Sequence, residues 1–212
     1  MDNFEEALKI LVYGLENNNL NMKDDSIPVG ISNRHVHLSK EDLETLFGKG
    51  YELTKLKDLS QPGQYAAKET VIICGPKGAI EKVRILGATR EKTQIEILAG
   101  DCFKLGIKAE PRLSGKLDNT PGLTIIGSQG SVQTENGLII GQRHIHMLPE
   151  DADKLNVKDG ENVSIKIEGI RSGVLDNVIV RAVENSALEC HLDMEEANAM
   201  GLDSKSKIKI IK

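Results

Sequence analysis

The sequence predicts a mostly β protein with short helices, arranged as two copies of one β-rich unit. From Ile27 onward, short runs of β-branched residues are broken by Gly and Pro, which is typical of strands in a barrel or sandwich. The chain also repeats itself, because ISNRHVHLSKEDLETL, from Ile31, matches IGQRHIHMLPEDADKL, from Ile140. Two later pairs of segments match as well: KGAIEKVRIL with SGVLDNVIVR, and QIEILAGDCFKLGI with ECHLDMEEANAMGL.

Residues 1–26 precede the first repeat and predict an amphipathic helix followed by a linker. Phe4, Leu8, Leu11 and Leu15 recur at helical spacing, and the stretch NNNLNMKDDSIP that follows is polar. Such a helix on a tether can dock on another protein surface, and it can equally fold back onto its own domain. Both interpretations stay open.

The expected strands and helices divide between the two repeats. We place the first repeat at residues 27–112, and the crossover and second repeat at residues 113–212, because the Pro- and Gly-containing segment EPRLSGKLDNTPG is typical of a connection. Helices should begin after Ser39 and at Pro149, since acidic residues follow both. The clearest expected strands lie at 70–73, 82–86, 123–126, 162–167 and 178–180.

Composition and charge exclude several classes of protein. The formal net charge of −5 argues against a general nucleic-acid binder, although a local basic pocket for an anion remains compatible with it. No run of about 18 apolar residues exists, so we expect no membrane span, and the acidic N-terminus does not resemble a secretory signal. Cys74, Cys102 and Cys190 form no CxxC pair, which favours a reducing interior.

The placement of histidine predicts a metal site. Four of the five histidines form two RHxH motifs, His35 with His37 and His144 with His146. On a strand, residues at positions i and i+2 point to one face, so each pair can share one metal ion. A single such motif is more often an ordinary pair of strand histidines, but two copies at equivalent positions of a repeat favour metal binding.

The fifth histidine completes the pattern. His191 matches Glu96 in the aligned repeats, so each copy supplies three candidate ligands. His₂-carboxylate and His₃ sets are usual for catalytic zinc, while imidazole-rich sites also suit iron, copper or nickel. An exposed strand carboxylate is the alternative for Glu96. The two predicted triads are His35, His37 and Glu96, and His144, His146 and His191.

Arg90 is the candidate anion-binding residue. It lies six positions before Glu96, and on an extended segment an even spacing places both side chains on one side. The guanidinium fork matches two phosphate oxygens, and the alternative is a solvated arginine in a charged stretch. Arg34 and Arg143 precede the histidine pairs, point the opposite way from the first histidine, and are expected in salt bridges.

Covalent acyl-enzyme chemistry is not favoured. The chain has no Walker-type or dinucleotide-binding glycine loop and no GxSxG motif. Cys190 stands beside His191, but on a strand neighbouring side chains face opposite ways.

A series of motifs resembles the phosphate propanoyltransferase family. The motifs are VGISNRHVHL, LSQPGQYAAKET, GPKG, RLSG, GQRHIHM and HLDMEEANAMG, and they run in this order from Val29 to Gly201. The resemblance implies two small β-barrel domains with exchanged segments, and two zinc ions per chain. It also implies an acyltransferase (phosphotransacylase) that reversibly converts acyl-CoA and phosphate into acyl phosphate and coenzyme A, with a short acyl group, propanoyl or acetyl.

Carried over residue by residue, the resemblance assigns one zinc to the first triad and the other zinc to the second. Arg90 falls on the family's phosphate-binding arginine and becomes the candidate catalytic residue, and Ser114, in RLSG, falls near the active site. The mechanism we favour is direct attack of phosphate on the thioester. Arg90 and a zinc would orient phosphate, and metal charge would stabilise the oxyanion or the CoA thiolate.

Two other interpretations of the same residues stay open. One is a zinc-dependent acyl-CoA thioesterase or other metallohydrolase, and the other is a non-enzymatic structural module that binds metal or associates with a shell. The first repeat also carries extra residues within GKGYELTKLKDLSQPGQYAAKET, which either contact CoA or close the domains.

We expect a homodimer with acyl-CoA and phosphate as partners, and neither nucleic acid nor membrane. The expected location is the cytoplasm or the lumen of a bacterial microcompartment, as in propanediol degradation or acetate metabolism. In microcompartment members of the family an N-terminal helix and linker act as an encapsulation tag, and residues 3–15 have that form.

Overall fold

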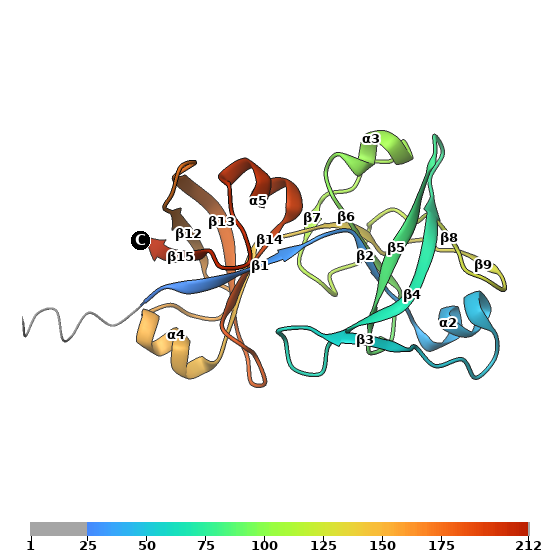
Figure 1. Cartoon of the computed structure of the whole chain (residues 1–212), viewed down its shortest axis with the longest axis horizontal. Helices are drawn as coiled ribbons and strands as arrows, with labels where there is room; N and C mark the ends of the chain where they lie inside the picture. Colours follow the sequence, from blue (N-terminus) through green and yellow to red (C-terminus); the bar gives the residue numbers. More distant parts are fainter. Residues whose placement is uncertain (1–24, 212) are drawn as a thin grey trace, which may run out of the picture.

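The computed structural model describes residues 25–211 and shows two β units side by side (Figure 1). One unit is a closed barrel of six strands, and the other is a curled sheet of nine strands. The prediction of a mostly β fold with short helices is confirmed. Of the two predicted barrels, only one is closed, because the end strands of the nine-stranded sheet, of two and three residues, do not pair with each other.

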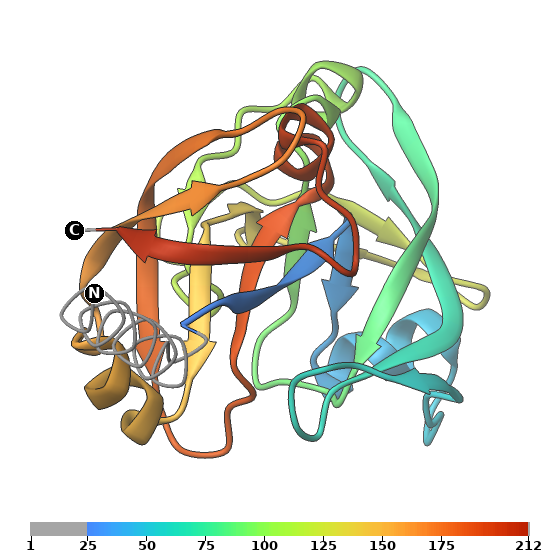
Figure 2. The ribbon, with the colours of Figure 1, turned by 60° about the vertical axis from the view of Figure 1, so that its left-hand side comes forward.

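The closed barrel combines the start of the described chain with its C-terminal third. Around the ring the strands are β1 (Ile27–Ser32), β14 (Glu189–Asp193), β11 (His144–Met147), β13 (Gly173–Ala182), β12 (Asn162–Ile167) and β15 (Lys207–Ile211). Figure 2 shows the blue β1 lying among the orange and red strands of this barrel. This is an exchange of a segment between units, as the resemblance implied.

The nine-stranded sheet uses the middle of the chain. Its order is β7 (Pro111–Arg112), β10 (Leu138–Gly141), β6 (Gln94–Ile97), β2 (His35–His37), β5 (Ala79–Gly87), β4 (Tyr65–Cys74), β8 (Thr124–Ile126) and β9 (Ser131–Gln133), and β3 (Lys55–Asp58) pairs with β4 off this path. The predicted boundaries of 27–112 and 113–212 stay a prediction about domains; in the strand pairing, β8, β9 and β10 belong to the sheet.

The chain passes between the units twice, and each passage leads directly into a His-x-His motif. Two residues connect β1 of the barrel to β2 of the sheet, and two connect β10 of the sheet to β11 of the barrel. Each connection holds an arginine in a salt bridge, as expected: the Nε of Arg34 donates to Asp101 at 2.7 Å, and Arg143 pairs with Glu196. Both histidine pairs therefore lie where the two units meet.

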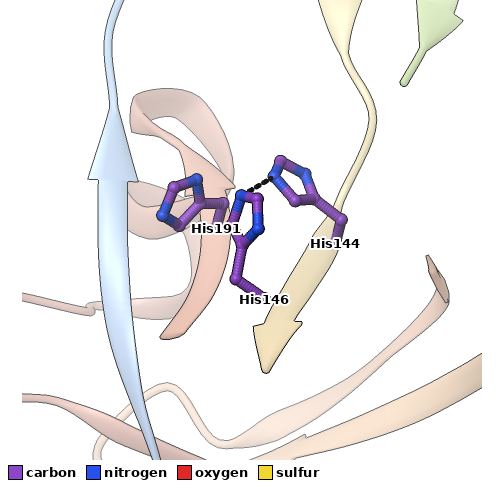
Figure 3. A group of neighbouring side chains, drawn as sticks. All are labelled: His144, His146 and His191. Carbon is purple, nitrogen blue, oxygen red and sulfur yellow. Dashed lines mark hydrogen bonds between the residues drawn. The ribbon is translucent and has the colours of Figure 1, made fainter. Parts of the chain in front are cut away.

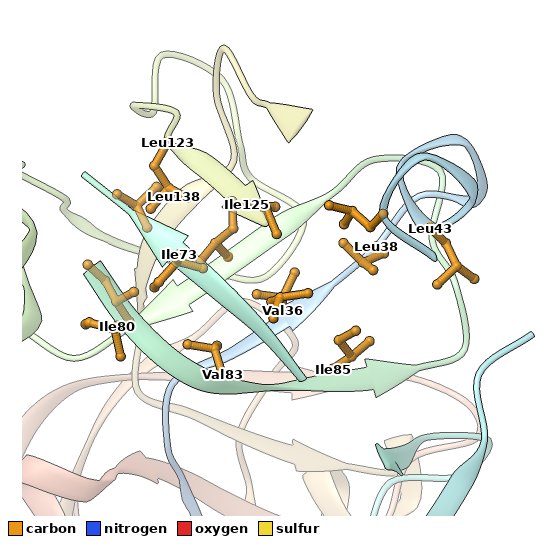
Figure 4. Packing of buried hydrophobic residues seen from close by; sticks show 14 of the residues in the cluster. Val36, Leu38, Leu43, Ile73, Ile80, Val83, Ile85, Leu123, Ile125 and Leu138 are labelled. Carbon is orange, nitrogen blue, oxygen red and sulfur yellow. The ribbon is translucent and has the colours of Figure 1, made fainter. Parts of the chain in front are cut away.

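Each unit has its own aliphatic core. In β12, Val163, Ile165 and Ile167 point inward and are buried, while the residues between them are less buried or exposed, which is the period of two expected for a strand with one buried face. In the sheet, the buried cluster includes Val36, the residue between the two histidines of β2 (Figure 4). Packing of this residue fixes β2, so the histidines on its other face are held rigidly.

Four short helices follow the strands that carry the predicted ligands. They are α2 (Lys40–Phe47) after β2, α3 (Asp101–Leu105) after β6, α4 (Pro149–Leu155) after β11 and α5 (Met194–Met200) after β14. The two predicted helix starts are confirmed: the side chain of Ser39 accepts from the backbone N–H of Asp42 at 3.1 Å, and α4 begins at Pro149. Within each repeat the helices thus occur at equivalent positions.

The predicted N-terminal helix at residues 3–15 and its linker lie outside the described residues. Across residues 25–211, no helix has the length and apolar character needed to cross a membrane.

Candidate metal centre

The six predicted ligands come together as two groups of three. In each group, one potential ligand atom per residue lies within 4.8 Å of the others. Both groups line one cavity of about 870 Å³, which Arg90 and Ser114 also line. We call the group from the sheet, His35, His37 and Glu96, the sheet triad, and the group from the barrel, His144, His146 and His191, the barrel triad.

Strand register assembles the sheet triad. β2 and β6 run antiparallel with His35 directly opposite Glu96, and the His35 Nε2 lies 3.4 Å from the Glu96 Oε1. The other ring nitrogen of His35 donates to the backbone oxygen of Asn33 at 2.8 Å, which leaves Nε2 as the acceptor nitrogen when the ring is neutral. His37, two positions on, is 2% exposed and lies on the same face.

The pKa values of the three groups in the sheet triad depend on one another. Burial opposes ionisation of Glu96, but the neighbouring His35 and their hydrogen bond outweigh it and lower the pKa of this carboxyl well below its usual range. Burial lowers the pKa of His35, and the Glu96 charge overrides it, so that the pKa is raised. Burial, with His35 and Arg90 nearby, lowers the pKa of His37 to about 3. Glu96 is therefore an anion, and His37 is neutral.

The barrel triad repeats this construction. His144 lies opposite His191 in the antiparallel pair of β11 and β14, and its Nδ1 donates to the backbone oxygen of Gln142 at 2.7 Å. The three rings face one another with centroids 4.7 to 4.9 Å apart (Figure 3). Burial is the main cause that lowers the pKa of His144 to about 4 and of His146 to about 3. Neutral imidazoles are the form that binds metal.

The donor atoms fit a divalent metal ion. Because the Nδ1 of His144 donates, its Nε2 presents a lone pair, and this nitrogen faces the Nε2 of His146 at 3.1 Å. In the sheet triad, the anionic carboxylate of Glu96 lies with the two imidazoles and supplies negative charge for a cation. The sets, His₂Glu and His₃, are those of zinc sites that keep an open coordination position.

Arg90 lies against the sheet triad. Its Nη2 donates to the Nε2 of His37, and its Nη1 donates to the Oγ of Ser114, both at 2.8 Å. The structure therefore brings Arg90 and Ser114 together at the edge of the sheet triad. The backbone N–H of Arg90 donates to the carbonyl of Leu38 at 2.9 Å, which anchors its segment next to β2.

Several residues of the cavity were not found from the sequence. Gln94 donates from Nε2 to Glu96 at 2.6 Å and to Ser114 at 2.9 Å. Arg181 lines the cavity and is paired in register with His146. The signal for Gln94 was available, because it precedes a predicted ligand by two strand positions. Arg181 carried no such signal, since its approach depends on the pairing of β11 with β13.

Comparisons with known proteins show which family the chain is related to. The family profile described as phosphate propanoyltransferase matches residues 28–203. The chain belongs to the phosphate propanoyltransferase family. A phosphate propanoyltransferase of Rhodobacter capsulatus is 55% identical over 186 residues, 88% of this chain and 86% of the relative. One from Thermotoga maritima is 55% identical over 190 residues, covering 89% and 90% of the two chains, and one from Enterococcus faecalis is 42% identical over 212 residues, covering 100% and 99%.

The family relationship makes this chain an acyltransferase. The part of the chain that matches the phosphate propanoyltransferase family contains both triads, Arg90 and Ser114. These side chains line one cavity.

Proposed function

We propose that this protein is a phosphate acyltransferase that reversibly converts a short-chain acyl-CoA, propanoyl or acetyl, and phosphate into acyl phosphate and CoA. The observation that carries the proposal is the position of the Arg90 guanidinium against His37 and Ser114, within a cavity that both triads line. An arginine fork beside two candidate metal sites is suited to a tetrahedral oxyanion such as phosphate.

In this proposal Arg90 binds and orients phosphate, and Ser114 fixes the guanidinium plane. The sheet triad and the barrel triad would each hold one zinc ion, which, when bound, supplies positive charge for the substrate oxyanion and a borderline-soft partner for a thiolate. Glu96 is a carboxylate, whereas the three ligands of the barrel triad are imidazoles, so the two ligand sets differ in charge.

The chemical step is direct attack. An oxygen of phosphate forms a bond to the thioester carbonyl carbon, the carbon–sulfur bond breaks, and CoA leaves as the thiolate. Holding phosphate next to the thioester converts a bimolecular encounter into a positioned one. Cys190 is unsuited to a covalent route, because it is fully buried in the barrel core and burial raises the pKa of its thiol to about 12.

The test is the release of CoA from acetyl-CoA and from propanoyl-CoA, with and without phosphate, together with zinc analysis of the purified protein. The proposal expects two zinc ions per chain and release that saturates with phosphate. A metal-dependent thioesterase on the same residues would release CoA at an undiminished rate without phosphate. A non-enzymatic metal module would bind zinc without turnover.

A proposal about the oligomeric state and the location follows from the resemblance to the phosphate propanoyltransferase family. We propose a homodimer, and a role for residues 3–15 in contact with a microcompartment shell. Both are tested by the sedimentation of the full chain and by its co-sedimentation with purified shells, with a chain lacking residues 1–26 as the control.

A further inference from the structure

Glu189 makes a contact with His191 that the proposed mechanism does not use. It lies two positions before His191 on β14, so both side chains lie on one face of the strand. The Nε2 of His191 donates to the Oε2 of Glu189 at 2.6 Å. The Nδ1 is then the nitrogen left for the barrel triad. Figure 3 shows one nitrogen of the His191 ring on the side of the other two rings and one turned away.

A segment of the sheet unit fixes the Glu189 carboxylate. The hydroxyl of Ser60 also donates to its Oε2. The next residue, Gln61, is only 5% exposed; its Nε2 donates to the carbonyl of Ala187 at 3.0 Å, and its Oε1 accepts from the N–H of Ala187 at 3.2 Å. Both residues lie within residues 48–70, the stretch that contains the extra residues of the first repeat. This segment is therefore hydrogen-bonded to β14, the strand that carries His191, and to the residue two positions before that strand.

Gly30 provides the space for the pair. It lies opposite His191 in the parallel pairing of β1 with β14. A Cβ at this position would lie 2.6 Å from the Cδ of Glu189 and 2.9 Å from the Cδ2 of His191, both shorter than Cβ contacts in proteins. Because glycine weakens a strand, a glycine in the middle of β1 is explained by this close approach.

In the sheet triad, too, the residue two positions before the third ligand supports that ligand, but there the supporting side chain donates the hydrogen bond instead of accepting it. Gln94 occupies the repeat position of Glu189, two residues before the third ligand, and donates to Glu96 at 2.6 Å. It is held by a serine too, since its Nε2 lies 2.9 Å from the Oγ of Ser114. A carboxylate ligand thus receives an amide donor, and an imidazole ligand faces a carboxylate acceptor. The polarity of each supporting side chain matches the ligand that it holds.

We propose that Glu189 and Ser60 are positioning residues that orient His191 and thereby set the affinity of the barrel triad for its metal. The inference rests on the proposed function in taking the barrel triad as a metal site. A carboxylate that accepts the outer N–H of a ligand imidazole fixes its tautomer and orientation and raises its basicity as a ligand. Because Ser60 comes from the sheet unit, the barrel site is complete only when residues 48–70 are docked.

The test measures zinc affinity at one site at a time, by competition with a chromophoric chelator. In a His35→Ala background only the barrel triad keeps three ligands, and in a His144→Ala background only the sheet triad does. Glu189→Ala is expected to weaken the barrel site about 10- to 100-fold, the usual effect of losing such a partner. Glu189→Gln and Ser60→Ala should weaken it less, and Ser60→Thr, which keeps the hydroxyl, should restore it.

The sheet site is expected to keep its affinity in all of these variants, which separates positioning from a general loss of structure. Glu184→Gln, at an exposed carboxylate near the same strand, is the matched control and should leave both sites unchanged. Circular dichroism checks folding, and Ser60→Ala carries the test if Glu189→Ala does not fold.

The inference is overturned if Glu189→Ala, made in the His35→Ala background, binds zinc at the barrel site as tightly as the His35→Ala parent does. If Glu189→Ala does not fold, the same result for Ser60→Ala overturns it. Equal weakening of both sites would overturn it as well. If the protein with both triads intact binds no zinc, the proposed function fails instead, so the two failures are distinguishable.

Discussion

Substitution of Arg90 is expected to impair the use of phosphate without removing metal. In the structure the guanidinium lies between Ser114 and His37, at 2.8 Å from each. Arg90→Ala removes two N–H donors and a positive charge from the place where phosphate is proposed to bind. It removes none of the six predicted ligands.

The expected size follows from the contacts. A hydrogen bond to a charged group contributes about 1.5 to 3 kcal/mol, and about 1.4 kcal/mol corresponds to a factor of ten in binding. Loss of one such bond would raise the KM for phosphate about 10- to 150-fold, and because Arg90 offers two donors, this is the smallest increase expected for Arg90→Ala. Arg90→Lys keeps the charge but loses the fork, so its effect should be smaller.

The assay is the initial rate of CoA release over a range of phosphate concentrations, with zinc content measured on the same samples. The KM for acyl-CoA should change little. Arg171→Ala, at an exposed arginine whose side chain donates to the carbonyl of Ala199, is the control. An unchanged saturation curve for phosphate in Arg90→Ala would refute the assignment, and loss of zinc would show that Arg90 acts on the metal sites instead.

Three further predictions follow from the same geometry. Glu96→Gln should reduce bound zinc from two ions to one, and a variant that keeps two would contradict the assignment of Glu96 as a ligand. Cys190→Ser should leave unchanged the number of thiols that react with a disulfide reagent in the native protein, because burial raises the pKa of Cys190 to about 12; a lower number would contradict its burial. Because the folded pKa of His37 is about 3 and that of His144 about 4, below the ordinary 6.5, the unfolded chain binds more protons as the pH falls below about 6.5. Chelator-treated protein should therefore lose thermal stability from pH 7 to pH 4.5, with a weaker dependence in His144→Asn, and an equal dependence in both proteins would count against neutral buried histidines.

The internal repeat is the feature of the sequence that made the two triads and part of the fold predictable. The match of RHVH with RHIH, and of Glu96 with His191, selects residues that strand pairing then places opposite one another. Periodicity also located the long strands. It could not show that the sheet stays open, since closure depends on how far the end strands extend.

Of the residues that support the ligands, some could have been predicted from the sequence and others could not. Gln94 and Glu189 stand two positions before a predicted ligand, so the strand period alone could have found them. Ser60 and Gln61 could not be found, because their partners lie more than a hundred positions away and only the docking of the two units brings them together. Local pattern thus predicts the ligands, and tertiary contact determines what holds them.

Acyl transfer to phosphate can be observed by ³¹P NMR of the purified protein with propanoyl-CoA and phosphate. We expect a new acyl phosphate resonance that grows in step with free CoA, and no CoA release when phosphate is left out. Release of CoA with free propanoate and no acyl phosphate signal would contradict it.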